Sequence, residues 1–321
     1  MKAAVVGVFG EAPRYQEFPM PEPTGPHEVL VDVLASGLHP RVRSQADGSH
    51  YAGTGELPLV PGIDGVGRTR DGKLRYFVLP DTTMGAMAEQ TVVDLRRSVE
   101  LPADSDPVGI AAAMNPAMSS WVALRRRIDF KAGQSVLIMG ATGSAGRLAV
   151  QVAKRLGAAH VVAAGRGAER LAALAALGAD RTVNLDEGPE VVSRRLGEAA
   201  TTIDVVLDYL WGRPTADALR AIIPRRSDDA QPLTWIELGS VAGREAPIPS
   251  AALRAARLQI VGSGQGSVPT SDIVAELPEL AAEIGRGRFR VDARPMPLAD
   301  VQQAWRDAKT SFERIVVVPE P

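Results

Sequence analysis

The chain of 321 residues is long enough for two domains, and its 45% hydrophobic content is sufficient for two cores. A net charge of −2 at pH 7 and a pI near 6.2 argue against a surface that binds nucleic acid. The absence of cysteine excludes disulfides, thiolate catalysis and cysteine-ligated zinc. Residues 1–13 contain no signal-peptide cleavage site and no segment resembles a membrane span, so we expect a cytoplasmic protein.

Residues 1 to about 100 are rich in predicted strands and in turns marked by proline and glycine. Strands are expected at 2–9, 28–35 and 74–79, and turns at 19–26, 58–67 and 70–72. The segment 28–35 alternates imperfectly between polar and apolar residues, which is typical of a half-buried antiparallel strand. This part of the chain is therefore predicted to form a β-rich domain.

From residue 118 to residue 265, predicted strands alternate with predicted helices. The strands are expected at 136–139, 161–164, 181–184, 204–207, 234–238 and 259–261, and the helices include 169–177, 190–200 and 215–222. Six short strands separated by helices predict an α/β domain with a doubly wound parallel sheet. Residues 266–321, with helices at 270–285 and 298–310 and a strand at 314–318, have no obvious place in that sheet and are expected to return to the first domain.

A glycine-rich turn follows the first of these six strands. The apolar run Val136–Met139 leads into Gly140–Gly146, and a helical pattern with one apolar stripe follows. A helix N-terminus behind such a turn directs backbone N–H groups at a pyrophosphate. The predicted contacts to a dinucleotide are Ala141, Thr142, Gly143, Ser144, Ala145 and Gly146, with Ala141 in the place of the usual first glycine. A close-packed turn without a ligand is the alternative interpretation.

The end of the second predicted strand indicates which dinucleotide is bound. Domains that prefer NADH carry an acidic residue there for the ribose 2′-hydroxyl, whereas this chain has Gly165 and Arg166 and no carboxylate before Glu169. Gly165 leaves room for a 2′-phosphate, and the guanidinium of Arg166 can bind that phosphate. We therefore predict NADPH as the cofactor. The alternative is that Arg166 is only a solvated loop residue.

Ligands of open α/β sheets bind at the carboxyl ends of the strands. Leu238, Gly239 and Ser240 end the fifth predicted strand and are expected to contact the cofactor. Tyr209 and Trp211, after the fourth strand, could flank the cofactor, although core packing is the more common fate of such aromatic residues.

The chain resembles the medium-chain dehydrogenase/reductase superfamily, and within it the zinc-free quinone oxidoreductases. The resemblance runs nearly end to end and rests on the order and spacing of several segments. These are Gly25-Pro-His-Glu-Val-Leu-Val31, Pro61-Gly-Ile-Asp-Gly-Val-Gly67, Ser119-Ser-Trp-Val-Ala-Leu124, the turn Gly140–Gly146, Gly178-Ala-Asp180 and Gly262-Ser263.

The resemblance implies a GroES-like, β-rich catalytic domain built from residues 1–117 and 266–321, a Rossmann domain over residues 118–265, and a homodimer. It also implies that Ser119 hydrogen-bonds the nicotinamide side of the cofactor and that Ser263 lies nearby. Ser119 could instead cap the helix that runs into Leu124.

The chain departs from the zinc-dependent members of the superfamily at their metal ligands. Those enzymes have Gly-His-Glu where this chain has Gly62-Ile63-Asp64, and cysteine where it has His39. A catalytic zinc needs three protein ligands, and His39 and Asp64 supply only two. We therefore expect no metal. The chemistry that the resemblance implies is hydride transfer from NADPH to a quinone or an α,β-unsaturated carbonyl.

The proton donor is the least defined part of this prediction. His39 could protonate a developing enolate, because the pKa of histidine lies near neutral pH, or it could be a structural histidine beside Pro40. Tyr51 could orient a carbonyl oxygen or only line the cleft, and solvent could also supply the proton. Two other functions remain open, an enoyl-thioester reductase and a non-catalytic NADPH-binding sensor or structural protein.

Overall fold

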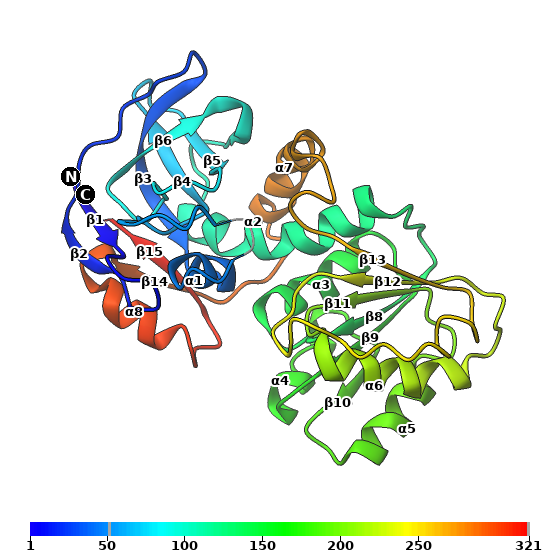
Figure 1. Cartoon of the computed structure of the whole chain (residues 1–321). Helices are drawn as coiled ribbons and strands as arrows, with labels where there is room; N and C mark the ends of the chain where they lie inside the picture. Colours follow the sequence, from blue (N-terminus) through cyan, green and yellow to red (C-terminus); the bar gives the residue numbers. More distant parts are fainter. Residues whose placement is uncertain (51–52, 320–321) are drawn as a thin grey trace. The chain divides into compact units, whose positions relative to one another are not determined.

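The computed structural model describes residues 1–50 and 53–319, and it separates into two compact units (Figure 1). Unit 1 comprises residues 1–116 and 274–321, and unit 2 comprises residues 117–273. Helix α2 (Pro107–Val122) and its π-helical extension Ala123–Arg127 carry the chain from unit 1 into unit 2. Within the described residues, no helix is long and apolar enough to cross a membrane.

Unit 2 is built on a six-stranded parallel sheet, which confirms the predicted doubly wound α/β fold. Its strands are β8 (Ser135–Met139), β9 (His160–Gly165), β10 (Arg181–Asn184), β11 (Val205–Asp208), β12 (Leu233–Glu237) and β13 (Leu258–Gly262). They lie in the order β10-β9-β8-β11-β12-β13, so the order reverses between β8 and β11. That reversal is the topological switch point at which such sheets bind ligands.

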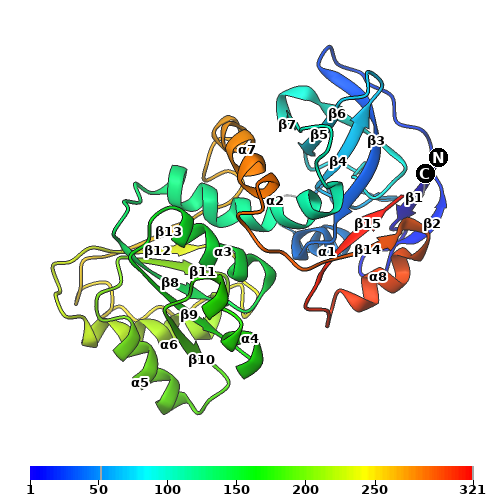
Figure 2. The same ribbon diagram turned by 180° about the vertical axis from the view of Figure 1, so that it is seen from behind.

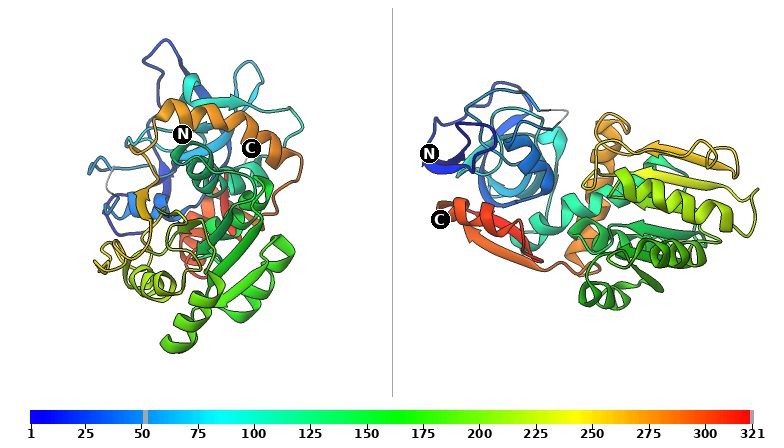
Figure 3. Two further views of the ribbon diagram at one scale, coloured as in Figure 1. Left: turned by 90° about the vertical axis from the view of Figure 1, so that its right-hand side faces the viewer. Right: turned by 60° about the horizontal axis from the view of Figure 1, so that its bottom comes forward.

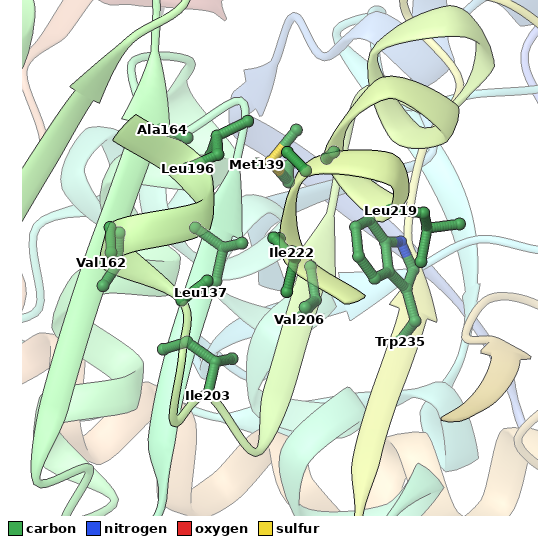
Figure 4. Close-up of a cluster of buried hydrophobic side chains, with 14 of the residues drawn as sticks. Leu137, Met139, Val162, Ala164, Leu196, Ile203, Val206, Leu219, Ile222 and Trp235 are labelled. Carbon is green, nitrogen blue, oxygen red and sulfur yellow. The ribbon is translucent and has the colours of Figure 1, made fainter. Parts of the chain in front are cut away.

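The core of unit 2 lies between the sheet and helices α5 (Pro189–Ala199) and α6 (Gly212–Ile222). Figure 4 shows Trp235 beside Leu219, with Leu137 and Val206 on neighbouring strands, and all four side chains are almost fully buried. Burial of one such side chain stabilises the fold by roughly 1.5–3 kcal/mol. Helix α3 (Ser144–Arg155) packs on β8 and β9. The single helix predicted over residues 169–177 is not continuous in the structure. It is divided into α4 (Ala168–Ala172) and the 3₁₀ turn Ala175–Leu177.

Unit 1 contains a mostly antiparallel sheet to which both ends of the chain contribute. The strands of its main path are β14 (Ala293–Pro297), β15 (Arg314–Val318), β3 (Glu28–Gly37), β4 (Asp64–Thr69), β5 (Leu74–Val78) and β7 (Ser98–Glu100), in that order. Strand β6 (Gln90–Asp94) pairs with β3, and β1 (Lys2–Val5) pairs with β2 (Arg14–Glu17). Figure 2 shows β14 and β15 beside β3.

The C-terminal segment of the chain packs on the N-terminal strands in unit 1. Helix α7 (Thr270–Gly285) spans the boundary between the two units, and α8 (Val301–Asp307) and β15 follow it in unit 1. The predicted helix 298–310 begins as a 3₁₀ turn at Leu298–Asp300. Helix α8 packs on β2 and β15, and Figure 3 shows this red segment beside the blue N-terminal strands. Helix α1 (Pro40–Ala46) joins the same core through Val42 and Ala46.

The prediction of a turn over residues 58–67 is wrong at its end, because β4 already begins at Asp64. Three glycine positions in this segment made it resemble a turn, yet Gly65 and Gly67 lie against the bulged part of β3. A Cβ atom on Gly65 would lie 2.8 Å from the carbonyl oxygen of Ala35, and one on Gly67 would lie 2.6 Å from that of Asp32. These glycines therefore permit close approach of two strands rather than a reversal of the chain.

Candidate functional site

The glycine-rich turn is held against the ends of β8 and β9. The backbone N–H groups of Gly140 and Ala141 both donate to the carbonyl oxygen of Ala164, each over 2.9 Å. Gly140 has a φ of +84°, which favours glycine. A Cβ atom on Gly146 would lie 2.3 Å from the carbonyl oxygen of Gly140, so only glycine lets α3 start this close to the strand.

The N-terminus of α3 faces this turn. Gly143 is its N-cap residue, and within the described part of the chain no side chain caps the helix there. The first-turn N–H groups, which include those of Ser144, Ala145 and Gly146, have no acceptor within the helix and carry the positive end of its dipole. This arrangement fits a pyrophosphate.

The end of β9 forms a second part of the site. A Cβ atom on Gly165 would lie 2.9 Å from Thr142 Oγ1, and the backbone N–H of Arg166 donates to the same oxygen over 3.3 Å. Asp186 Oδ2 accepts from the N–H of Gly167 over 2.8 Å and so holds the turn that presents Arg166 to solvent. Asp186 is not among the residues predicted from the sequence, although its position just after β10 could have pointed to it.

The predicted residues after β12 and β13 lie at the same edge of the sheet. The N–H groups of Leu238 and Gly239 donate to the carbonyl oxygen of Asp208, over 2.7 and 3.3 Å, while Ser240 follows directly. Ser263 N donates to the carbonyl oxygen of Glu237 over 2.9 Å. The parallel sheet therefore gathers 141–146, 165–166, 238–240 and 263 along one edge.

Ser119 lies inside α2 and not at its N-terminus, so the capping interpretation of this residue is wrong. Its Oγ lies 2.9 Å from Tyr209 Oη, and burial raises the pKa of the Tyr209 phenol to about 12. Tyr209 follows β11 directly. Both residues stand out in the sequence, but nothing there pairs them, because 90 residues separate them in the chain.

A buried polar cluster surrounds His39 in unit 1. His39 Nε2 lies 3.0 Å from Asp64 Oδ1, Tyr76 Oη donates to Asp64 Oδ2 over 2.8 Å, and Arg314 Nη1 donates to the carbonyl oxygen of Leu38 over 3.0 Å. His39 is 1% exposed, and Tyr76 and Asp64 are fully buried. The sequence analysis missed Tyr76 and Arg314, while Tyr51 lies outside the described residues.

Burial determines the protonation of this cluster. It lowers the pKa of His39, an effect that the Asp64 carboxylate opposes and the charges of Arg314 and Arg41 reinforce. Burial also raises the pKa of Tyr76 well above its usual value and lowers that of Arg314 to about 10. His39 is then a neutral imidazole that donates to Asp64, a geometry that favours its structural interpretation. Among the described residues, no group of three or more His, Asp and Glu side chains is placed to hold a metal ion.

This burial makes the stability of unit 1 sensitive to acid. Below its ordinary pKa of about 6.5, His39 takes up a proton in the unfolded chain but resists it in the folded one, so the free energy of unfolding falls as the pH falls. We expect the wild type to lose about 1 kcal/mol more than His39→Gln between pH 7 and pH 5.5, measured by urea denaturation. The matched control is His27→Gln, at an exposed position, which keeps the wild-type dependence. An equal loss in wild type and His39→Gln would contradict the assignment.

The chain is similar to known dehydrogenases and reductases. The family model described as zinc-binding dehydrogenase matches residues 145–225, which begin in α3 and end after α6. A probable NADPH-dependent quinone reductase of Emericella nidulans is 31% identical, over 99% of this chain and 100% of that protein. A chloroplastic NADPH-dependent alkenal/one oxidoreductase of Arabidopsis thaliana is 27% identical, over 67% of this chain and 63% of that protein.

A solved structure is similar over its whole length. The quinone oxidoreductase of Thermus thermophilus, which was also determined in complex with NADPH, superposes with a TM-score of 0.81. It is 27% identical, and the match covers 99% of this chain and 100% of that chain.

Proposed function

Since the chain belongs to the quinone oxidoreductase-like branch of the medium-chain dehydrogenase/reductase superfamily, we propose that it is an NADPH-dependent reductase of quinones or α,β-unsaturated carbonyls. The observation that carries the proposal is the arrangement of residues at the carboxyl ends of the parallel strands. There an uncapped helix N-terminus and the pair Gly165–Arg166 provide complementary sites for a pyrophosphate and a 2′-phosphate.

The residues present fit NADPH. The pyrophosphate would lie on the turn formed by residues 141–146, and Arg166 would bind the 2′-phosphate with its exposed guanidinium. The nicotinamide half would then extend past the switch point toward the ends of β11, β12 and β13. Ser119, Leu238, Gly239, Ser240 and Ser263 are the proposed contacts in that half.

When bound, NADPH supplies a hydride to the acceptor and is thereby oxidised to NADP⁺. The acceptor takes up a proton as well and is reduced by two electrons. The part of the protein is to orient the two reactants and to exclude competing water. We propose that no metal takes part, since His39 and Asp64 are only two candidate ligands and a catalytic zinc needs three from the protein. Because His39 is buried in this cluster, we assign it a supporting role and propose solvent as the proton source.

The proposal is tested by following NADPH absorbance with a panel of acceptors. We expect oxidation with 1,4-benzoquinone, 9,10-phenanthrenequinone or an aliphatic enone, and slower oxidation with NADH in place of NADPH. Turnover with crotonyl-CoA alone would replace the proposal with an enoyl-thioester reductase. Tight binding of NADPH without reduction of any acceptor would favour a non-catalytic protein.

Removal of the Arg166 guanidinium should abolish the preference for NADPH. We expect Arg166→Ala to raise the Kd for NADPH about 10- to 100-fold, because hydrogen bonds to a charged group are lost. The Kd for NADH, which has no 2′-phosphate, should stay the same. Arg213→Ala, at an exposed arginine on α6 that pairs with Asp217, is the matched control and should change neither constant. A parallel weakening of both dinucleotides would argue against a 2′-phosphate site at Arg166.

We also propose a homodimer, formed through β13, the outermost strand on one side of the sheet in unit 2. Strand β13 is an edge strand with half-buried Leu258 and Ile260, and Val241 and Leu253 nearby in sequence are 74% and 51% exposed. An apolar edge strand of this kind tends to pair with another chain. Light scattering should give the mass of two chains, and a monomeric mass at micromolar concentration would refute the dimer.

A further inference from the structure

The segment after β11 holds an unusual backbone conformation. Trp211 has φ +54° and ψ −162°, and it is the only residue other than glycine with a positive φ in the described part of the chain. A bulky residue in this region costs of order 1–3 kcal/mol and persists only where its surroundings enforce it. Strained residues of this kind cluster at active sites, ligand clamps and switch regions.

A single buried carboxylate enforces this conformation. Asp208 Oδ1 accepts from the N–H groups of Leu210 and Trp211, over 2.8 and 3.1 Å. Asp208 Oδ2 accepts from Thr215 Oγ1 over 2.5 Å and from Trp235 Nε1 over 2.9 Å. Asp208 itself is fully buried, so the end of β11 is tied to both α6 and β12. Two hydrogen bonds therefore hold the backbone of Leu210 and Trp211 to Asp208, and two more hold the Asp208 carboxylate to α6 and β12.

The hydrogen bonds of Asp208 to the residues that follow Tyr209 also hold Tyr209 in place. Its N–H donates to the carbonyl oxygen of Met139 over 3.1 Å, at the end of β8. A Cβ atom on Gly140 would lie 3.3 Å from Tyr209 Cβ, and one on Gly239 would lie 3.5 Å from the Tyr209 carbonyl oxygen. Tyr209 thus lies between the first residue of the glycine-rich turn and the turn after β12. From there its phenol reaches Ser119.

Either of these two hydroxyl groups can donate in the bond that joins them. We infer that Tyr209 Oη–H donates and Ser119 Oγ accepts, because a phenol is a stronger acid than an aliphatic alcohol. A serine hydroxyl that accepts such a bond has its own O–H polarised and becomes a stronger donor. Ser119 is half-exposed, whereas Tyr209 is 9% exposed, so Ser119 is the member of the pair that a ligand can reach.

We propose that Tyr209 is a positioning residue, which orients the Ser119 hydroxyl to donate a hydrogen bond to the nicotinamide half of NADPH. The inference rests on the proposed function, because it takes NADPH to bind along this edge of the sheet. It adds a residue that is held in place through Asp208 and that acts on the cofactor through Ser119.

Calorimetric titration with two ligands tests the inference. NADPH carries both halves of the cofactor, whereas adenosine 2′,5′-bisphosphate lacks the nicotinamide half. We expect Tyr209→Phe to raise the Kd for NADPH about three- to tenfold, the effect of one hydrogen bond, and to leave the Kd for the bisphosphate unchanged. Ser119→Ala should weaken NADPH at least as much, and the double variant should resemble Ser119→Ala alone. Ser119→Thr keeps the hydroxyl and should bind like the wild type.

Tyr15→Phe is the matched control, since it removes a phenol from an exposed tyrosine on β2 in unit 1. Its Kd values for both ligands should equal those of the wild type. Equal weakening of both ligands in Tyr209→Phe would show a general structural role and overturn the inference. An unchanged NADPH affinity, or additive effects in the double variant, would overturn it as well. A wild-type protein that binds neither ligand would instead refute the proposed function.

Discussion

The parallel direction of the six strands in unit 2 is the constraint on which the candidate site depends. Because every strand runs the same way, the carboxyl ends of all six strands lie along one edge of the sheet. Residues as far apart in the chain as Met139 and Ser263 are therefore brought to the same edge. Backbone hydrogen bonds between neighbouring strand ends hold this edge together, such as those from Gly140 and Ala141 to the carbonyl oxygen of Ala164. Side chains at this edge are thereby held on a rigid frame, which is what precise binding of a dinucleotide requires.

The parts of the fold that depend on local chemistry could be predicted from the sequence. The apolar strand, the glycine-rich turn and the amphipathic α3 lie within about twenty residues, so their meaning is legible without knowledge of distant partners. The same holds for β8, β9 and β11, each of which is marked by an apolar run. The glycines of β4 misled the prediction because their role, close approach to β3, is set by a strand elsewhere in the chain.

The parts of the site that depend on distant pairing could not be read from the sequence. Asp208 looks like an ordinary strand-terminal residue until Thr215 and Trp235 are seen to converge on it. Tyr76 and Arg314 join the cluster around His39 from positions far apart in the chain, and neither belongs to a recognisable motif. Partners of a buried charge become visible only in three dimensions, since burial creates the need for them.

The pairing of β15 with β3 has a consequence for the order in which the protein is made. Arg314 donates to the carbonyl oxygen of Leu38 across 276 residues, and Val316 pairs with Gly37. A ribosome releases the chain from its N-terminus, so the sheet of unit 1 lacks an interior strand until residues 314–318 emerge. Unit 2 has its whole sheet once Gly262 has left the ribosome. During synthesis, the sheet of unit 2 can therefore be completed while β3 of unit 1 still lacks its partner β15.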